Sequence, residues 1–407
     1  MRHARRPSER GRSALRFVFV SVIVLALSAS SVAAIAIWQT VGNIAPGIHL
    51  AQLPGQTAVP PGIGAAEGEV NLLLVGTDTR TGQGGGFSSA DNIAASSGAG
   101  SNDVTMLLHI SKDHTNASVV SFPRDLMVAV PGCPQSGGTT SAPAQSAMFN
   151  TTLSTGGLPC VVLTVEQLTG ITIPYAAEIS FDGVIAMSNA VGGVSVCLAT
   201  PVDDSYTGLH LAAGQQTLVG ADALAFVRSR HGVGDGSDLG RISNQQVFLS
   251  ALMRKIASAG VLTNPVTLYS LANAALTNMQ LSDTLSNVAA PVSIALALQA
   301  VSLPKLVFLQ YPTTADPTNP NRVVADSSPA QLVNTALQTD QPLQLTGGVG
   351  RAAVADPSAA ATPTPIPTPT PSSAGSASAS PSAAPGVSLP TSVTGQTAAE
   401  ATCTKGS

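Results

Sequence analysis

The chain has 407 residues, a formal net charge of −4 and a small charged fraction. Only 10% of its residues are Asp, Glu, Lys or Arg, against about 25% in ordinary soluble domains. Aromatic residues make up 3% of the chain. These values argue against a nucleic-acid binder, which needs a basic face or rows of aromatic stacking platforms. Because charge is scarce, the places where it clusters are informative.

The N-terminus combines a basic segment with a long apolar run. Six of the 18 Lys and Arg residues lie within residues 1–16, and residues 17–37 contain no charged side chain. A helix of this length spans a hydrocarbon core of about 30 Å, and the Arg-rich flank places the N-terminus in the cytoplasm. We therefore expect a single-pass cell-membrane anchor with an extracellular body. The alternative is a cleaved signal peptide with a site near residues 34–36, which exports the same body.

The middle of the chain alternates between two apolar patterns after a Pro-, Gly- and Ala-rich linker over residues 38–69. Short apolar runs predict strands at 70–76, 104–110, 117–122, 194–198 and 306–310. Helical spacing predicts helices at 160–168, 181–191, 220–229, 238–259 and 331–337, with a broken helical pattern over 261–299. Residues 81–102 are expected to form a long loop. Together these elements predict one α/β domain over residues 70–346, a central sheet with helices on both faces.

The composition changes at about residue 347. Residues 362–371 read TPTPIPTPTP, and Ser, Ala and Thr are frequent on either side. A segment of this composition buries little apolar surface and favours an extended chain. We therefore expect residues 347–407 to form a disordered tail.

The four cysteines agree with an exported body. Cys133 and Cys160 lie in one Gly- and Pro-rich stretch and can pair in an oxidising compartment. Cys197 lies in an apolar run, where we expect a small buried hydrophobic residue, and Cys403 lies in the tail. The sequence contains no CxxC or Cys/His spacing typical of a zinc site.

Five of the twelve cations beyond residue 16 gather in short polar segments: Arg80, Arg124, Arg228, Arg230 and Arg241. The planar guanidinium group matches phosphate oxygens. Arg228 and Arg230 point the same way if their segment is extended, and Arg241 and Gln245 share a helix face. Asp238 would cap the N-terminus of that helix, which is a further anion site. The pattern predicts phosphate binding.

Two carboxylates, Asp78 and Asp103, stand at expected strand ends. They can hold a hard cation such as Mg²⁺, whose other ligands are water and substrate phosphates. A metal and several arginines on a diphosphate would stabilise charge during phosphoryl transfer. Each residue alone has a structural alternative, such as a turn or a solvated strand edge, so the prediction depends on their joint appearance. The sequence contains no P-loop and no GxSxG motif.

The same segments, in the same order, resemble the LytR-CpsA-Psr family of bacterial cell-wall ligases. The matching blocks include NLLLVGTDTR (71–80), NDVTMLLHIS (102–111), SFPRD (121–125), GADALAFVRSRH (220–231) and DLGRISNQQ (238–246). The resemblance implies an extracellular α/β/α domain on an N-terminal membrane helix. It also implies that the protein transfers a glycopolymer from a polyprenyl pyrophosphate carrier to peptidoglycan, with Mg²⁺ assisting.

The resemblance assigns roles to individual residues. Asp78 and Asp103 match the metal-associated acids, and they would act in catalysis together with Arg124, Arg228 and Arg230. Pyrophosphate would be bound by Arg80, Arg124, Arg228, Arg230, Arg241 and Gln245, with Asp238 framing the site. The chain departs from the family at Ser101 and Asn244, where basic residues are common, and at Met148-Phe149-Asn150. Asp103 and Asp125 are both candidates for the general base.

We therefore expect a phosphotransferase of cell-wall biogenesis in an actinobacterial host, with a pyrophosphatase side activity. One alternative is a non-catalytic wall-binding scaffold of the same fold, which the departure at Ser101 suggests. The other is a membrane-bound transcriptional attenuator, which the topology and the acidic charge oppose. Teichoic acid, arabinogalactan and capsule all remain open as the polymer. The expected partners are the lipid-linked glycopolymer, peptidoglycan and the membrane, but not nucleic acid.

Overall fold

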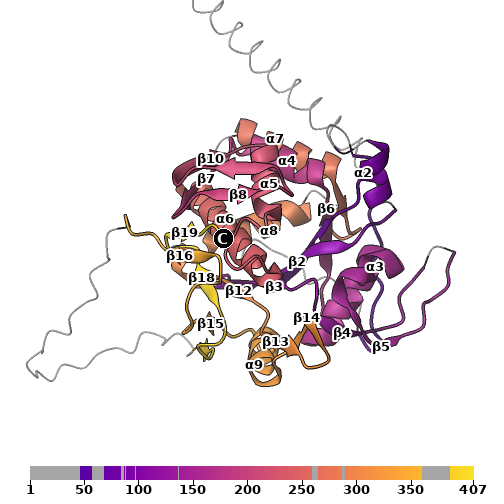
Figure 1. Ribbon diagram of the computed structural model, residues 1–407. Helices are drawn as coiled ribbons and strands as arrows, with labels where there is room; N and C mark the ends of the chain where they lie inside the picture. The colour runs from indigo at the N-terminus through magenta and orange to yellow at the C-terminus, as the bar shows by residue number, and fades with distance from the viewer. Residues whose placement is uncertain are drawn as a thin grey trace, which may run out of the picture. The chain divides into compact units, whose positions relative to one another are not determined.

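The computed structural model describes residues 46–56, 68–83, 87, 89–96, 98–135, 137–258, 265–286, 289–359 and 386–407. The chain divides into two units, Met1–Ala45 and Pro46–Ser407, and every described residue belongs to the second (Figure 1). The expected cytoplasmic segment and the membrane helix at residues 17–37 lie outside the described residues. Within the described part, no helix is long and apolar enough to cross a membrane.

A seven-stranded mixed sheet forms the centre of the second unit, in the order β11-β6-β1-β2-β3-β12-β18. Its strands are β1 (Val70–Thr77), β2 (Asn102–Ile110), β3 (Ala117–Phe122), β6 (Tyr175–Ile179), β11 (Met279–Leu281), β12 (Leu306–Gln310) and β18 (Gly395–Thr397). The β1–β6 and β3–β12 pairs are parallel and the other four are antiparallel. The C-terminal ends of β1 and β3 and the N-terminal end of β2 therefore lie side by side, at the same end of the strands.

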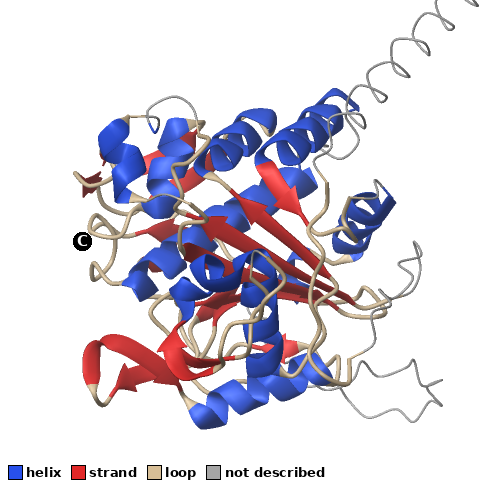
Figure 2. Ribbon diagram, turned by 90° about the vertical axis from the view of Figure 1, so that its right-hand side faces the viewer, coloured by secondary structure: helices blue, strands red, loops and turns tan. Residues whose placement is uncertain are grey.

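Helices cover both faces of this sheet, as predicted (Figure 2). Leu73 and Val75 of β1 enter a core with α3 (Thr152–Thr169) and α9 (Ser327–Gln338). Leu72 and Leu74 belong to a second core with α6 (Asp238–Ser258) and α8 (Ala289–Ala300). Successive strand side chains point to opposite faces, so a strand buried on both faces reads as a continuous apolar run.

A smaller four-stranded sheet has the order β10-β7-β19-β16. With α5 (Ala221–Arg228) and α6 it encloses a third core that contains Phe226 and Phe248. Its strands are β7 (Val194–Leu198), β10 (Gly214–Leu218), β16 (Ala353–Ala355) and β19 (Thr402–Thr404). Two-stranded pairs are formed by β4 (Met127–Val130) with β5 (Ala144–Met148), β8 (Val202–Asp204) with β9 (Leu209–Leu211), β13 (Thr313–Asp316) with β14 (Asn319–Ala325), and β15 (Leu343–Gln344) with β17 (Val387–Ser388).

The five strands and five helices expected from the sequence are present, with shifts at their ends. The helix expected at 181–191 is α4 (Phe181–Ala190), and the one expected at 160–168 is the second half of α3. Two expectations need correction. The loop at 81–102 contains a short helix, α2 (Ala90–Ala95). The region 261–299 is not wholly helical, because β11 lies between α7 (Pro265–Asn278) and α8 and pairs with the edge of the sheet.

The expectation of a disordered tail over residues 347–407 is wrong for residues 386–407. There, β18 pairs with β12 of the central sheet, and β19 lies between β7 and β16. Residues 347–359 also belong to the folded unit, because they include β16. The proline-rich repeat lies outside the described residues. Its composition obscures the two- and three-residue strands that follow it, which are too short to show a periodic pattern.

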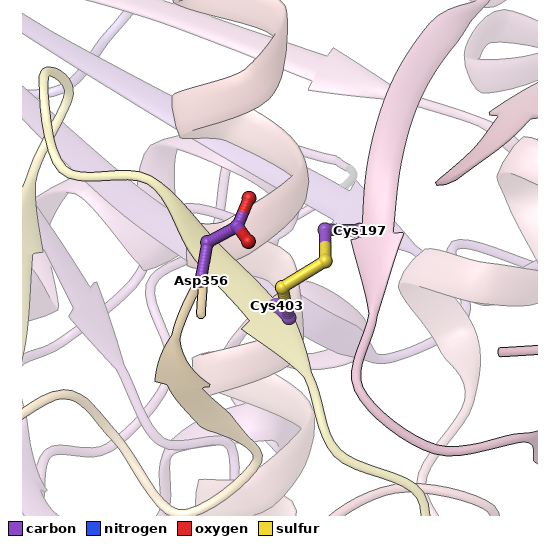
Figure 3. A group of neighbouring side chains, drawn as sticks. All are labelled: Cys197, Asp356 and Cys403. Carbon is purple, nitrogen blue, oxygen red and sulfur yellow. A yellow bond between two sulfur atoms is a disulfide. The ribbon is translucent and has the colours of Figure 1, made fainter. Parts of the chain in front are cut away.

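Two disulfides cross-link the unit. Cys133 pairs with Cys160, as expected. Cys197 pairs with Cys403, 206 residues away, which corrects the expectation that Cys197 is only a buried hydrophobic residue. Asp356 lies beside this second disulfide (Figure 3). Because both sulfurs are bonded to each other, they are not available as thiolate ligands, and the group is not a metal site.

Candidate functional site

The expected site residues come from the ends of separate elements, at one end of the central strands of the sheet. Asp78 follows β1, Asp103 is the second residue of β2, and Arg124 follows β3. Arg228 ends α5, and Asp238 begins α6. The antiparallel pairing of β1 with β2 and of β2 with β3 brings the first three together.

Four of these side chains form an ion-pair cluster, which we define as Asp103, Arg124, Asp238 and Arg241. Nη1 of Arg124 donates to Oδ1 of Asp103 at 3.0 Å, and its Nε lies 3.7 Å from Oδ1 of Asp238. Nη2 of Arg241 lies 2.6 Å from Asp238 Oδ1 and donates to the Asp103 carbonyl at 2.7 Å. Burial acts to lower the pKa of Arg124, but the carboxylates of Asp103 and Asp238 outweigh it and raise that pKa. Arg124 therefore stays charged.

Arg228 is a partly buried cation with incomplete charge compensation. Its guanidinium carbon lies 4.1 Å from the centre of the Phe181 ring, a cation–π contact from α4. Burial and repulsion from Arg80 and Arg241 lower the pKa of Arg228, and the carboxylates of Asp103 and Asp78 only partly oppose this. A bound anion would relieve the repulsion among these arginines.

An apolar cavity of about 300 Å³ ends at these charged groups. Asp103, Arg228, Arg241 and Gln245 line its polar end. Its apolar wall comes from β1, β2, α4, α5, α6 and α7, and includes Leu74, Met106, Val184, Leu224, Leu252 and Leu271. The cavity thus joins an apolar chamber to an arginine-rich end.

Arg228 and Arg230 do not point the same way, contrary to expectation. Arg228 lies in the last turn of α5 and the chain bends at Ser229, so the two are not on one extended strand. The buried Asp204 carboxylate holds this bend, because it accepts hydrogen bonds from Ser229 Oγ (2.7 Å) and Arg230 N (3.0 Å). Arg228 lines the apolar cavity, whereas Arg230 lines a different, polar cleft.

Asp78 and Asp103 are linked through the backbone of Ser101. Ser101 N donates to Asp78 Oδ1 at 2.7 Å, and the Ser101 carbonyl accepts from the amides of Asp78 and Asp103. Asp78 Oδ2 makes no hydrogen bond within the described residues, and Asp103 Oδ2 lies 3.8 Å from Nη1 of Arg241. Each carboxylate thus keeps an oxygen for a hard cation. Two carboxylates and a phosphate-bearing substrate are a donor set that suits Mg²⁺.

The two α6 amides expected near the site have structural partners. Gln245 Nε2 donates to the Val227 carbonyl at 2.9 Å, which fixes the turn that carries Arg228. Asn244 is fully buried; it donates to the Phe226 carbonyl and accepts from Thr404 Oγ1 at 2.8 Å. Asn244 therefore faces the C-terminal strand β19. The departure at this position removes no contact from the cavity.

Sequence reasoning missed two supporting residues. Phe181, expected only as part of a helix, carries Arg228 on its ring. Asn102 is fully buried, donates to the Phe149 carbonyl, and accepts from Thr152 Oγ1 and Leu153 N. The backbone amide of Asn150, the residue after Phe149, donates to the Arg124 carbonyl at 3.0 Å. The Met148-Phe149-Asn150 block therefore fixes the backbone beside the ion-pair cluster.

The chain matches a known protein family and several curated relatives. The LytR_cpsA_psr family model matches residues 48–331. The cell wall biosynthesis protein LcpA of Corynebacterium glutamicum is 33% identical over 283 residues, covering 65% of this chain and 54% of that protein. A polyisoprenyl-teichoic acid–peptidoglycan teichoic acid transferase, TagU of Bacillus mycoides, is 28% identical over 195 residues, covering 48% and 55%. The chain thus spans about half the length of these curated relatives.

Two solved structures share the fold. A LytR-Csp2A-Psr enzyme from Actinomyces oris superposes with a TM-score of 0.51 at 22% identity, covering 72% of this chain and 96% of that one. A structure of TagT bound to LI-WTA has a TM-score of 0.51 at 22% identity, covering 72% and 98%. At this identity the likeness extends to the fold alone.

Proposed function

Because the chain belongs to the LytR-CpsA-Psr family, we propose that it is a glycopolymer transferase of cell-wall biosynthesis. The donor is a glycopolymer on a polyprenyl pyrophosphate carrier, and the acceptor is peptidoglycan. The names of two relatives, a cell wall biosynthesis protein and a teichoic acid–peptidoglycan transferase, support this class of reaction.

The observation that carries the proposal is the apolar cavity that ends at Arg228 and the ion-pair cluster. A polyprenyl pyrophosphate has the same two parts, an apolar chain and a compact anion. The lipid would occupy the apolar chamber, and the diphosphate would lie against Arg228, Arg241 and Arg80. A diphosphate there would also relieve the charge repulsion that lowers the pKa of Arg228.

In the proposed reaction an acceptor hydroxyl attacks the phosphorus that bears the glycopolymer. A new oxygen–phosphorus bond forms, the bond to the bridging oxygen breaks, and the polyprenyl phosphate leaves with the electron pair. The arginines hold the phosphoryl oxygens and neutralise the charge that develops on them. Asp78 and Asp103 would hold Mg²⁺, which when bound supplies further charge neutralisation on the diphosphate.

Variants Arg228→Ala and Asp78→Ala test this function. We expect each to lower the transfer of polymer to peptidoglycan by at least about a hundredfold, because each removes charge stabilisation from the transition state. The assay uses a lipid-linked glycopolymer with and without Mg²⁺, and the variants are first checked for native circular dichroism. Full activity of both variants would contradict the proposal. If the wild-type protein fails to bind polyprenyl pyrophosphate in calorimetry, a wall-binding scaffold is favoured instead.

A further inference from the structure

A second cleft, of about 660 Å³, adjoins the ion-pair cluster. Arg124 and Asp238 line this cleft, whereas their partners Asp103 and Arg241 line the apolar cavity. The cluster is therefore the wall that the two spaces share. Arg124 and Asp103 remain 23% and 25% exposed, so a ligand at the cluster can contact them.

The β13–β14 hairpin forms the outer side of this cleft. The backbone fixes it there, because Val323 N donates to the Asp125 carbonyl and Val323 forms a bridge with Leu126. Arg322, next to Val323 on β14, reaches to 3.6 Å from Asp125 Oδ1. The hairpin therefore places the Arg322 guanidinium beside the carboxylate of Asp125, the residue after Arg124.

The cleft is rich in cations. Four of the twelve cations beyond residue 16 line it, Arg124, Arg230, Arg322 and Arg351. Among the described residues, the Arg230 guanidinium makes one hydrogen bond, from Nε to the Gly236 carbonyl at 3.1 Å. Arg351, which is 55% exposed, pairs with Asp235 at 2.7 Å. Arg230, Arg322 and Arg351 thus line the same cleft, and their guanidinium groups have capacity for further anionic oxygens.

Asp125 is the carboxylate that faces this cleft beside the cluster. Its oxygens lie 3.9 Å from Nε of Arg124 and 3.6 Å from Nη1 of Arg322, both longer than a hydrogen bond. Its carboxylate can therefore accept a hydrogen bond from a ligand hydroxyl. Burial and the nearby Asp238 carboxylate raise the pKa of Asp125, against the opposing effects of Arg124, Arg322 and Arg230.

The geometry of phosphoryl transfer links the two spaces. The attacking and leaving oxygens lie roughly in line on opposite sides of the phosphorus. With the leaving lipid phosphate on the side of the apolar cavity, the attacking hydroxyl must approach from the other side. The polar cleft lies on that other side, because the ion-pair cluster stands between it and the apolar cavity.

We propose that this cleft binds the acceptor, a glycan that bears carboxylates, with Arg322 and Arg351 contacting the carboxylates and Asp125 accepting the proton of the attacking hydroxyl. This inference rests on the proposed transferase function and adds the acceptor side to it. In the step, the hydroxyl oxygen forms the bond to phosphorus, and its proton passes to the Asp125 carboxylate.

The test compares two acceptors in the full-length protein. One is a short, uncross-linked peptidoglycan oligosaccharide with its peptide carboxylates, and the other is a neutral chitin oligosaccharide of equal length. We expect Arg322→Gln and Arg351→Gln each to raise KM for the carboxylate-bearing acceptor about tenfold. KM for the neutral acceptor and binding of the lipid donor should not change. Lys305→Gln, which removes an exposed cation away from the cleft, is the matched control.

Asp125→Asn gives a second readout. We expect kcat for transfer to fall at least about a hundredfold, while donor affinity and KM for the acceptor stay near wild type. Unchanged acceptor KM in both arginine variants, with normal donor binding, would overturn the acceptor site and leave the transferase function standing. Absence of donor binding and of transfer in the wild type would instead reject the transferase function itself.

Discussion

At the residue scale, the charged side chains of the site differ in how completely an opposite charge compensates them. Asp238 and Arg241 are almost fully buried and paired at 2.6 Å, so they act as a fixed frame. Arg228 is different, because its guanidinium lies over the uncharged Phe181 ring and its cationic neighbours repel it. Paired charges hold the shape of the site, and the incompletely compensated one is available to an anionic ligand.

Replacing the ring under Arg228 tests this view. We expect Phe181→Leu to raise Kd for the lipid donor about three- to tenfold, because a partly buried cation–π contact contributes about 1 kcal/mol to holding the guanidinium. Phe181→Tyr, which keeps the ring, should stay near wild type. Donor titration by calorimetry measures the effect, and equal affinity in the Leu and Tyr variants would contradict it.

Glu178 on β6 should make stability depend on pH. Burial raises its pKa from 4.5 to about 7, so the folded protein favours the protonated carboxyl. Its contribution to stability is complete below about pH 4.5 and is lost as the pH rises to about 7. The stability of Glu178→Gln relative to wild type should therefore increase as the pH rises from 5 to 8, by at most about 3 kcal/mol.

Urea unfolding at both pH values measures this change. Glu166 has a similarly raised pKa of about 7, again because of burial, so some dependence on pH will remain in the Gln variant. An identical pH dependence in wild type and Glu178→Gln would show that Glu178 is not responsible.

At the scale of elements, the C-terminal segment completes the domain. β18 extends the central sheet beside β12, and β19 places Thr404 against Asn244 of α6. The Cys197–Cys403 disulfide ties β19 to β7. The helix that contributes Asp238 and Arg241 is therefore held by residues at the far end of the chain.

The two disulfides should differ in their effect on stability. In the chain-entropy description, a bond that closes the 206-residue separation contributes about 5 kcal/mol, and one that closes 27 residues contributes about 3.5 kcal/mol. We expect the Cys197→Ala/Cys403→Ala pair to lower the free energy of unfolding more than the Cys133→Ala/Cys160→Ala pair. Denaturant unfolding of both double variants decides this, and the reverse order would contradict the entropic account.

At the scale of the whole molecule, the proposed function requires the domain to meet a lipid-linked substrate at a membrane. The apolar segment at residues 17–37 and the basic residues before it remain the basis for that expectation. Both the anchor and the signal-peptide hypotheses export the domain, but only the anchor keeps it at the membrane surface.

Fractionation of cells tests the anchor. We expect the full-length protein to sediment with membranes, and a variant in which residues 17–37 are replaced by a cleavable signal peptide to appear in the soluble exported fraction. Mass spectrometry of the N-terminus provides the independent measurement. A mature protein that starts near Trp38 would contradict the anchor and support the signal peptide.

The sequence by itself determined the family, the alternation of strands and helices, and the gathering of polar residues at strand ends. These features are local, because side-chain periodicity and short motifs are written within ten or twenty residues. The structure then brought Asp103, Arg124, Asp238 and Arg241 together, as the motifs implied.

Only the tertiary structure decided which residues line the apolar cavity and which line the polar cleft. It separated Arg228 from Arg230, turned Asn244 toward β19, paired Cys197 with Cys403, and added Arg322 and Arg351 to the polar cleft. Most of these outcomes depend on contacts between positions tens to hundreds of residues apart. No local pattern encodes such contacts, because they arise only when packed cores and sheet register fix the elements against one another.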